Sequence, residues 1–217
     1  MVPKPRFATV AFDVDSTVSG IEGIDWLAAQ RGDLVARQIA ELTHQAMQGI
    51  IPLEQVYGAR LDTIRPCRDD IDALSRAYVA GLAPNCAETL VRLRRAGVQL
   101  ILVSGGIRNA LLPMAFGLDF EVGDVHAVDV RFDSSGAYAG FDASSPMTNS
   151  TGKHTLLASL PLVRPLLMVG DGATDLATRG AVDAFAAFTG FVSRDAVVRQ
   201  ADVVIPSFTE LAAYLLD

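Results

Sequence analysis

The stretch Phe7-Ala8-Thr9-Val10-Ala11-Phe12-Asp13-Val14-Asp15-Ser16-Thr17 is the most informative part of the chain, because an apolar run ends abruptly in two carboxylates. Short apolar runs rich in β-branched and aromatic residues are typical of buried parallel strands. Similar runs cover residues 98–103, 166–169, 184–188 and 202–205, and helical patterns cover 86–96 and 153–160. Strands that alternate with helices predict an α/β fold with a doubly wound, mostly parallel, Rossmann-like sheet.

The composition limits the classes of protein that this chain can belong to. Half of its 217 residues are hydrophobic, which excludes a disordered chain. A net charge of -7 argues against binding to nucleic acid or to an anionic membrane surface. No apolar run approaches the roughly 18 residues of a membrane span. Two cysteines in unrelated positions indicate a reducing compartment, so the sequence predicts a cytoplasmic protein.

Residues 18–81 interrupt the alternation of strands and helices. This segment holds several amphipathic helical patterns and no convincing strand. The helix boundaries are marked by Glu22 and Gly32, by Asp33 and Gly49, and by the prolines Pro52 and Pro66. We therefore expect an α/β core formed by residues 1–17 and 82–217, with residues 18–81 inserted as a small helical cap.

A second departure from the alternation lies between residues 125 and 141. There Val128, Val130 and Phe132 alternate with polar residues and precede the turn sequence Asp133-Ser134-Ser135-Gly136. Alternation followed by a glycine-containing turn predicts a β-hairpin.

Polar motifs follow three of the predicted strands. They are Asp13-Val14-Asp15-Ser16-Thr17, Ser104-Gly105-Gly106 and Gly170-Asp171-Gly172-Ala173-Thr174-Asp175. Each motif alone is more typical of a tight turn than of a site. Ligands of open α/β sheets bind outside the carboxyl ends of the strands, however, so we expect all three motifs to meet at one edge.

The carboxylates of these motifs predict a metal site. In an extended chain Asp13 and Asp15 point to the same side, and Asp171 and Asp175 can face the same space across a glycine-containing turn. Four clustered carboxylates repel one another, and a hard cation with oxygen ligands compensates that repulsion. We therefore expect Mg²⁺.

An anionic phosphate ligand fits beside such a cation. Ser104 and the neighbouring backbone donors are predicted to open a helix, where free N–H groups bind anions. Lys153 begins another predicted helix, and we expect it to pair with the carboxylate cluster.

Together these motifs and Lys153 resemble, in order and spacing, the haloacid dehalogenase superfamily of phosphohydrolases. The helical insertion after the first motif and the run Glu22-Gly23-Ile24-Asp25 are similar to the phosphoserine phosphatase family of that superfamily. Matches at residues 46–49, 60–61 and 104–108 add specificity. The loop 144–151 departs from the glycine-richer pattern of the family, which leaves the shape of that loop open.

The resemblance implies a reaction and a set of roles. Asp13 attacks phosphorus of O-phospho-L-serine, and Asp15 protonates the departing serine oxygen and later deprotonates water, in the last step of serine biosynthesis. Mg²⁺ is held by Asp13, Asp171 and the backbone carbonyl of Asp15, with Asp175 at or just behind these ligands. The resemblance further implies that phosphate is bound by Ser104, Gly105 and Lys153, and the rest of the substrate by Glu22, Arg60, Met47 and Thr174.

The expected identity of the substrate depends on Arg60 and Glu22. Arg60 lies within an apolar stripe at helical spacing, and on the residues alone its head group is better placed in water. The resemblance instead assigns the substrate carboxylate to Arg60 and the ammonium to Glu22. Arg194 follows the strand 184–188 and can either reach the site or lie on the surface.

Two other classes of function compete with this one. The first is a related phosphatase or phosphotransferase that acts on phosphothreonine or phosphocholine, or that passes the phosphoryl group from phosphoserine to homoserine. The second is a phosphate-accepting receiver domain, which also gathers aspartates, a hydroxyl and a lysine at one sheet edge. A receiver needs neither Asp15 nor the helical insertion, so the sequence favours an enzyme.

Overall fold

The computed structural model describes residues 5–47, 51 and 53–216, except for the side chains of 44–47 and 53. Within these ranges, a six-stranded parallel sheet has the order β3-β2-β1-β6-β7-β8. The strands are β1 (Thr9–Phe12), β2 (Gln99–Ile107), β3 (Val125–Val128), β6 (Leu166–Gly170), β7 (Ala184–Phe188) and β8 (Val203–Ile205). Five of them confirm predicted strands, and β3 is an edge strand that the sequence analysis did not separate from the hairpin.

The strand order creates a switch point between β1 and β6. From β1 the chain builds the sheet outward through β2 and β3, and later returns to build the other half through β6, β7 and β8. Phe12 at the end of β1 is paired with Leu102 on one side and with Val169 on the other. The carboxyl ends of β1 and β6 therefore lie close to one level, while β2 continues to Ile107, and a crevice between β1 and β6 is the expected ligand position.

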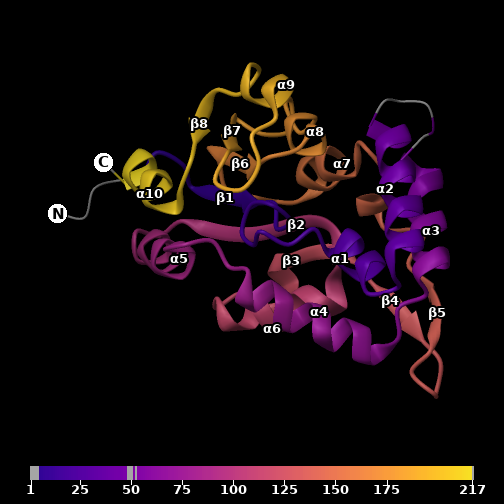
Figure 1. Cartoon of the computed structure of the whole chain (residues 1–217). Coiled ribbons are helices and arrows are strands. Elements are labelled where there is room, and N and C mark those ends of the chain that lie inside the picture. The colour runs from indigo at the N-terminus through magenta and orange to yellow at the C-terminus, as the bar shows by residue number, and fades with distance from the viewer. Residues whose placement is uncertain (1–4, 48–50, 52, 217) are drawn as a thin grey trace.

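Helices cover both faces of the sheet (Figure 1). On one face lie α5 (Cys86–Arg95) and α6 (Arg108–Gly117), and on the other lie α7 (Gly152–Ser159), α8 (Ala173–Leu176) and α9 (Asp195–Val198). The last helix, α10 (Phe208–Leu216), contacts α5. Every residue of β1 and β6 is buried, so the two strands that flank the switch point form the centre of the core. The doubly wound fold and the helices predicted at 86–96 and 153–160 are confirmed.

The insertion folds as the predicted helices. Figure 1 shows its first helices to one side of the sheet, whereas its last helix lies beside α6. The helices are α1 (Gly23–Ala29), α2 (Asp33–Met47), α3 (Leu53–Ile64) and α4 (Arg68–Ala80). The boundaries predicted at Gly49 and Pro52 lie outside the described residues. The two connections to the sheet run side by side, because Gly20 N donates to Gly81 O at 2.9 Å and Ala83 N donates to Val18 O at 2.9 Å.

The predicted hairpin is present as β4 (Val130–Phe132) and β5 (Tyr138–Phe141), which pair antiparallel. The inclusion of Val128 in that hairpin was wrong, because Val128 pairs with Ile107 of β2 as part of β3. The hairpin lies beside α3, where the rings of Phe141 and Tyr57 are 5.4 Å apart. Two short 3-10 turns, η1 (Val122–Asp124) and η2 (Pro146–Thr148), complete this half of the chain. Among the described residues, no helix combines the length and apolar character that a membrane span requires.

Candidate active site

Three carboxylates from two strand ends meet at the switch point. Oxygen atoms of Asp13, Asp171 and Asp175 lie within 4.8 Å of one another, and all three residues are buried. Asp13 directly follows β1, and the other two follow β6. The prediction that these motifs converge at one sheet edge is confirmed, and the cluster offers the oxygen ligands that a hard divalent cation prefers.

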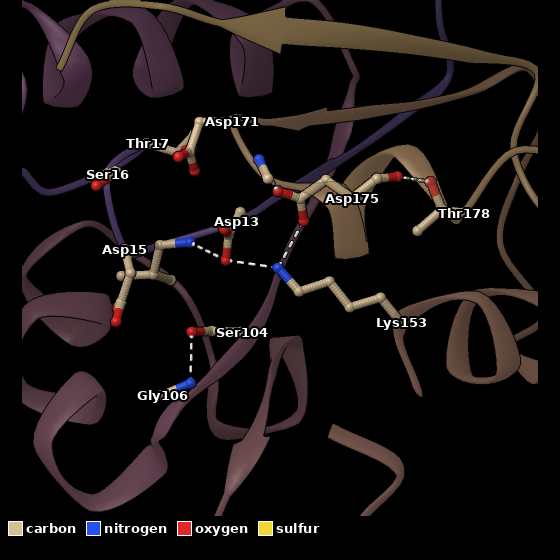
Figure 2. Close-up of polar contacts among 12 residues, drawn as sticks. Asp13, Asp15, Ser16, Thr17, Ser104, Gly106, Lys153, Asp171, Asp175 and Thr178 are labelled. Carbon is tan, nitrogen blue, oxygen red and sulfur yellow. Dashed lines mark hydrogen bonds and ion pairs between the residues drawn. The ribbon is translucent and has the colours of Figure 1, made fainter. Parts of the chain in front are cut away.

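Asp15 is not part of this cluster, so the prediction that four carboxylates share one space was wrong. That prediction assumed an extended chain beyond the first strand, but β1 ends at Phe12 and a turn begins at Val14. In Figure 2 the Asp13 carboxylate points toward Lys153, whereas the side chain of Asp15 points away from it. The turn therefore gives the two aspartates separate surroundings.

Lys153 neutralises part of the cluster, as predicted. Its Nζ atom, in the first turn of α7, lies 2.7 Å from Asp13 Oδ1 and 2.6 Å from Asp175 Oδ1 (Figure 2). Burial lowers the pKa of the Lys153 ammonium, but the two carboxylates outweigh that effect and raise it. The lysine is therefore a permanent cation in the site.

The Asp13 carboxylate is held through one of its oxygens. Oδ1 accepts hydrogen bonds from Val14 N at 2.8 Å and from Lys153, and Oδ2 has no hydrogen bond or ion pair among the described residues. Burial raises the pKa of Asp13, Asp175 adds to the increase, and Lys153 opposes it. A cation bound to the cluster favours the ionised form, which is the form that a nucleophile requires.

Asp175 is fixed more tightly than the other two aspartates. Its Oδ1 binds Lys153 and its Oδ2 accepts a hydrogen bond from Gly172 N at 2.9 Å. A β-carbon on Gly170 would lie 2.3 Å from Asp175 Cγ, so only glycine fits at the end of β6. With both oxygens already bound, Asp175 is suited to a place behind the direct ligands.

Asp15 has a separate, fully bonded environment. Its Oδ1 accepts a hydrogen bond from Tyr78 Oη at 2.8 Å, and its Oδ2 accepts one from Gly23 N at 2.9 Å. Burial, followed by the charge of Glu22, raises the pKa of Asp15 to about 7, although both hydrogen bonds lower it. A carboxyl group with a pKa in this range can give and take a proton near neutral pH.

Ser104 lies buried within β2, three residues before the strand ends at Ile107. Its Oγ accepts a hydrogen bond from Gly106 N at 2.9 Å, which leaves the hydroxyl proton free for an anion (Figure 2). The expectation that Ser104, Gly105 and Gly106 open a helix was wrong. They belong to β2, which continues to Ile107 through an irregular register, and α6 begins only at Arg108.

Arg194, which the sequence left between a site role and a surface role, is part of the site. Its guanidinium forms an ion pair with the Asp171 carboxylate, and its second terminal nitrogen lies 3.8 Å from Glu22 Oε1. Thr17 Oγ1 also lies 3.3 Å from Asp171 Oδ1 and donates to it. Glu22 itself is exposed and accepts a hydrogen bond from Ser16 Oγ at 2.6 Å.

Arg60 carries a guanidinium that is paired with no carboxylate among the described residues. Its Nη1 donates to the neutral Thr43 Oγ1 at 3.2 Å, and its guanidinium lies 5.8 Å from the ring centroid of Tyr57. Its Nε is buried without a hydrogen-bond partner, and Arg60 forms no ion pair within the described part of the chain. Burial lowers the pKa of Arg60, while Asp25 opposes that shift. The head group is therefore not simply solvated, contrary to the expectation from the residues alone.

Two predicted contacts have no support from the geometry. The side chain of Met47 lies outside the described residues. Thr174 is half-buried in the first turn of α8, and no hydrogen bond of its hydroxyl is seen among the described residues. Both remain predictions.

Sequence reasoning missed two residues that contact the site, Tyr78 and Thr17. Tyr78 lies on α4, 63 positions after its partner Asp15, and nothing in a helical apolar pattern identifies such a contact. Thr17 could have been found, because it closes the first polar motif.

Comparison with known proteins identifies close relatives, although no protein-family model matches the chain. The phosphoserine phosphatase of Rattus norvegicus is 37% identical over 209 residues, which cover 95% of this chain and 92% of that protein. The chloroplastic phosphoserine phosphatase of Arabidopsis thaliana is 35% identical over 93% of this chain and 70% of its own length.

Solved structures agree with the fold. A phosphoserine phosphohydrolase-like protein from Francisella tularensis superposes with a TM-score of 0.81 at 25% identity, over 94% of this chain and 98% of that one. A substrate-bound phosphoserine phosphatase superposes with a TM-score of 0.79 over 95% of this chain and 97% of that one; at 21% identity it supports the fold alone. On the identity and coverage of its curated relatives, the chain belongs to the phosphoserine phosphatase family.

Proposed function

We propose that this chain hydrolyses O-phospho-L-serine to L-serine and phosphate, with Asp13 as nucleophile and Asp15 as general acid and base. The proposal is supported above all by the different surroundings of these two aspartates. Asp13 lies in a cluster of three carboxylates that could hold a cation and has one oxygen unbonded among the described residues, while Asp15 lies outside that cluster in surroundings that favour a bound proton. Separate protonation states are what a nucleophile and an acid require.

The reaction then proceeds in two displacements. In the first, Asp13 Oδ2 forms a bond to phosphorus as the bond from phosphorus to the serine oxygen breaks, and that oxygen takes the proton of Asp15. In the second, a water oxygen forms a bond to phosphorus and gives its proton to Asp15, while the bond to Asp13 breaks. Phosphate leaves, and both aspartates return to their starting states.

The charge of the phosphate requires several compensating groups. Asp13, Asp171 and the backbone carbonyl of Asp15 would hold Mg²⁺, with Asp175 behind them, and three carboxylates within 4.8 Å suit such an ion. When bound, the ion neutralises negative charge on the phosphoryl group and on the nucleophile. Ser104, the backbone N–H of Gly105 and Lys153 would bind the non-bridging oxygens of the phosphoryl group.

The amino-acid part of the substrate meets the helical insertion. Arg60 would bind the substrate carboxylate, which supplies the anion that its partly buried guanidinium lacks. Glu22 would bind the ammonium group, and Met47 and Thr174 remain further predicted contacts. The pairing of Arg60 with the carboxylate and of Glu22 with the ammonium group would select an amino acid phosphate over a plain alkyl phosphate.

Residues 18–81 would act as a cap on the core formed by 1–17 and 82–217. Glu22 and Arg60 both belong to this segment, so the cap would complete the substrate site and exclude water when it closes. Equal protease sensitivity of 18–81 with and without a bound phosphate analogue would contradict this role. The cytoplasm remains the predicted location; the Arabidopsis relative is named as chloroplastic.

Phosphate release from matched esters tests the proposal. With Mg²⁺ present, we expect the highest kcat/KM for phosphoserine, a lower value for phosphothreonine, and much lower values for phosphoethanolamine and phosphocholine, which lack a carboxylate. Adding homoserine and measuring phosphohomoserine separates hydrolysis from phosphoryl transfer. A kcat/KM for phosphocholine equal to that for phosphoserine would contradict the roles of Arg60 and Glu22. A slow, single phosphorylation of Asp13 without turnover would instead indicate a receiver domain.

A further inference from the structure

Tyr78 Oη donates a hydrogen bond to Asp15, the proposed general acid. The two displacements described above give this hydrogen bond no role. We propose that Tyr78 is a positioning residue, which holds the Asp15 carboxyl group in the orientation needed to protonate the leaving oxygen of the substrate. The inference rests on the proposed function, because it assigns a role to Tyr78 through Asp15.

The Asp15 carboxylate is held by one hydrogen-bond donor on each of its oxygens. Gly23 N, at the start of α1, donates to Oδ2, and Tyr78 Oη, on α4, donates to Oδ1. One donor on each oxygen fixes the rotation of the carboxylate about its Cβ–Cγ bond. Both donors come from the helical insertion, one from its first helix and one from its last, so the insertion and not the sheet orients the acid.

The Tyr78 hydroxyl lies close to two glycines, Gly23 and Gly106. A β-carbon on Gly23 would lie 2.1 Å from Tyr78 Oη, and one on Gly106 would lie 3.3 Å from the same atom. The Gly106 β-carbon would also lie 3.1 Å from Ser104 Oγ and 3.4 Å from Asp15 Oδ1. The hydroxyl therefore reaches the proposed phosphate site between two backbone positions that carry no side chain.

The two donors to Asp15 differ in chemistry, because one is a backbone amide and the other is a hydroxyl. Gly23 N–H can only donate, whereas the Tyr78 hydroxyl can donate to ionised Asp15 and accept from its protonated form. Tyr78 is fully buried, and its backbone carbonyl accepts a hydrogen bond from Ser19 Oγ at 3.0 Å, which ties α4 to the connection between insertion and sheet. The hydroxyl can thus keep the carboxyl group in one orientation before and after proton transfer.

Tyr78→Phe tests this role by the choice of leaving group. The serine alkoxide needs a proton as it departs, whereas p-nitrophenolate does not, and kcat/KM reports the steps up to that departure. We expect kcat/KM for phosphoserine to fall roughly 10- to 100-fold and that for p-nitrophenyl phosphate to fall less than about 3-fold. Tyr214→Phe is the matched control, because it removes a tyrosine hydroxyl on α10 and should change neither value.

Whether Tyr78 acts through the Asp15 carboxyl group is tested by introducing Tyr78→Phe into the Asp15→Asn variant. There, Tyr78→Phe should cause no further loss of phosphoserine kcat/KM, because its effect passes through the Asp15 carboxyl group. Equal losses for both esters, no loss for phosphoserine, or a full additional loss in the Asp15→Asn background would each overturn the inference while leaving the proposed function intact. Wild-type protein that hydrolyses neither ester would overturn the proposed function and this inference with it.

A measurement on the wild-type protein covers the case in which Tyr78→Phe does not fold. A crystal structure with Mg²⁺ and a phosphate analogue should retain the hydrogen bond from Tyr78 Oη to Asp15 Oδ1. Separation of these two atoms beyond hydrogen-bond distance in that complex would overturn the positioning role.

Discussion

Replacing Arg60 with methionine should separate recognition of the substrate carboxylate from the chemistry at phosphorus. Methionine keeps an apolar stem beside Tyr57 but removes the guanidinium, whose contacts are a neutral hydroxyl and an aromatic ring. A charge-assisted contact to a substrate carboxylate in such surroundings contributes about 3–4 kcal/mol. The predicted loss in kcat/KM for phosphoserine is therefore roughly 10²- to 10³-fold.

Phosphoethanolamine makes this assay selective, because it has the phosphate and the ammonium group of phosphoserine but no carboxylate. We expect Arg60→Met to change its kcat/KM by less than about 3-fold, since the group that Arg60 binds is missing. Arg68→Met, on α4, removes a guanidinium that stacks on Phe132 and serves as the control. Equal losses for both esters would refute the reasoning, because Arg60 would then support the fold or the phosphate site and not the carboxylate.

The same variant has an expected effect on stability. Burial lowers the pKa of Arg60, which means that the charged guanidinium destabilises the folded state when no substrate is bound. Arg60→Met should leave the free energy of unfolding unchanged or raise it by up to about 1 kcal/mol, as measured by denaturant titration. A large destabilisation would indicate that the arginine has a structural anion partner.

Three further changes test other parts of the account. Gly170→Ala should displace Asp175, because its β-carbon would lie 2.3 Å from Asp175 Cγ, and phosphoserine turnover should fall at least about 100-fold while circular dichroism stays native. Lys153→Met should reduce kcat at least about 100-fold and lower the Tm, since buried carboxylates lose their cation; an unchanged Tm would contradict this. Asp70→Asn should cost about 1 kcal/mol at pH 7 after solvent screening, because Arg31 lowers the pKa of Asp70 to about 2. That contribution is present above the unfolded pKa near 3.9 and disappears as the pH falls toward 2, so equal losses at pH 7 and pH 2 would refute it.

Most of the sheet could be predicted because its central strands are buried on both faces. Burial of this kind leaves continuous apolar runs, as in β1 and β6, where every residue is buried. The edge strand β3 lacks that signature, since two of its four residues are only half-buried. Its pairing with β2 depends on a contact between distant segments, so the alternation at 125–141 could not show where the edge strand ends and the hairpin begins.

The carboxylate cluster could be predicted from the topology of the sheet. The surroundings of Asp15, the proposed general acid, could not be predicted in this way. Asp13 and Asp171 follow neighbouring parallel strands, whose carboxyl ends must share one edge. The direction of Asp15 depends instead on a turn that begins one residue after Asp13. Tyr78 and Arg194 reach the site from a helix of the insertion and from a loop, and neither position carries a periodic signal in the sequence.

The most direct test of the account is to identify the residue that carries the phosphoryl group during turnover. Wild-type protein mixed with Mg²⁺ and phosphoserine should be quenched in acid within one turnover and mapped by peptide mass spectrometry, with Asp15→Asn used to slow release of the intermediate. We predict a phosphoryl group on Asp13, and none in Asp13→Asn. A phosphoryl group on Ser104, or phosphate release by Asp13→Asn at the wild-type rate, would contradict the central claim.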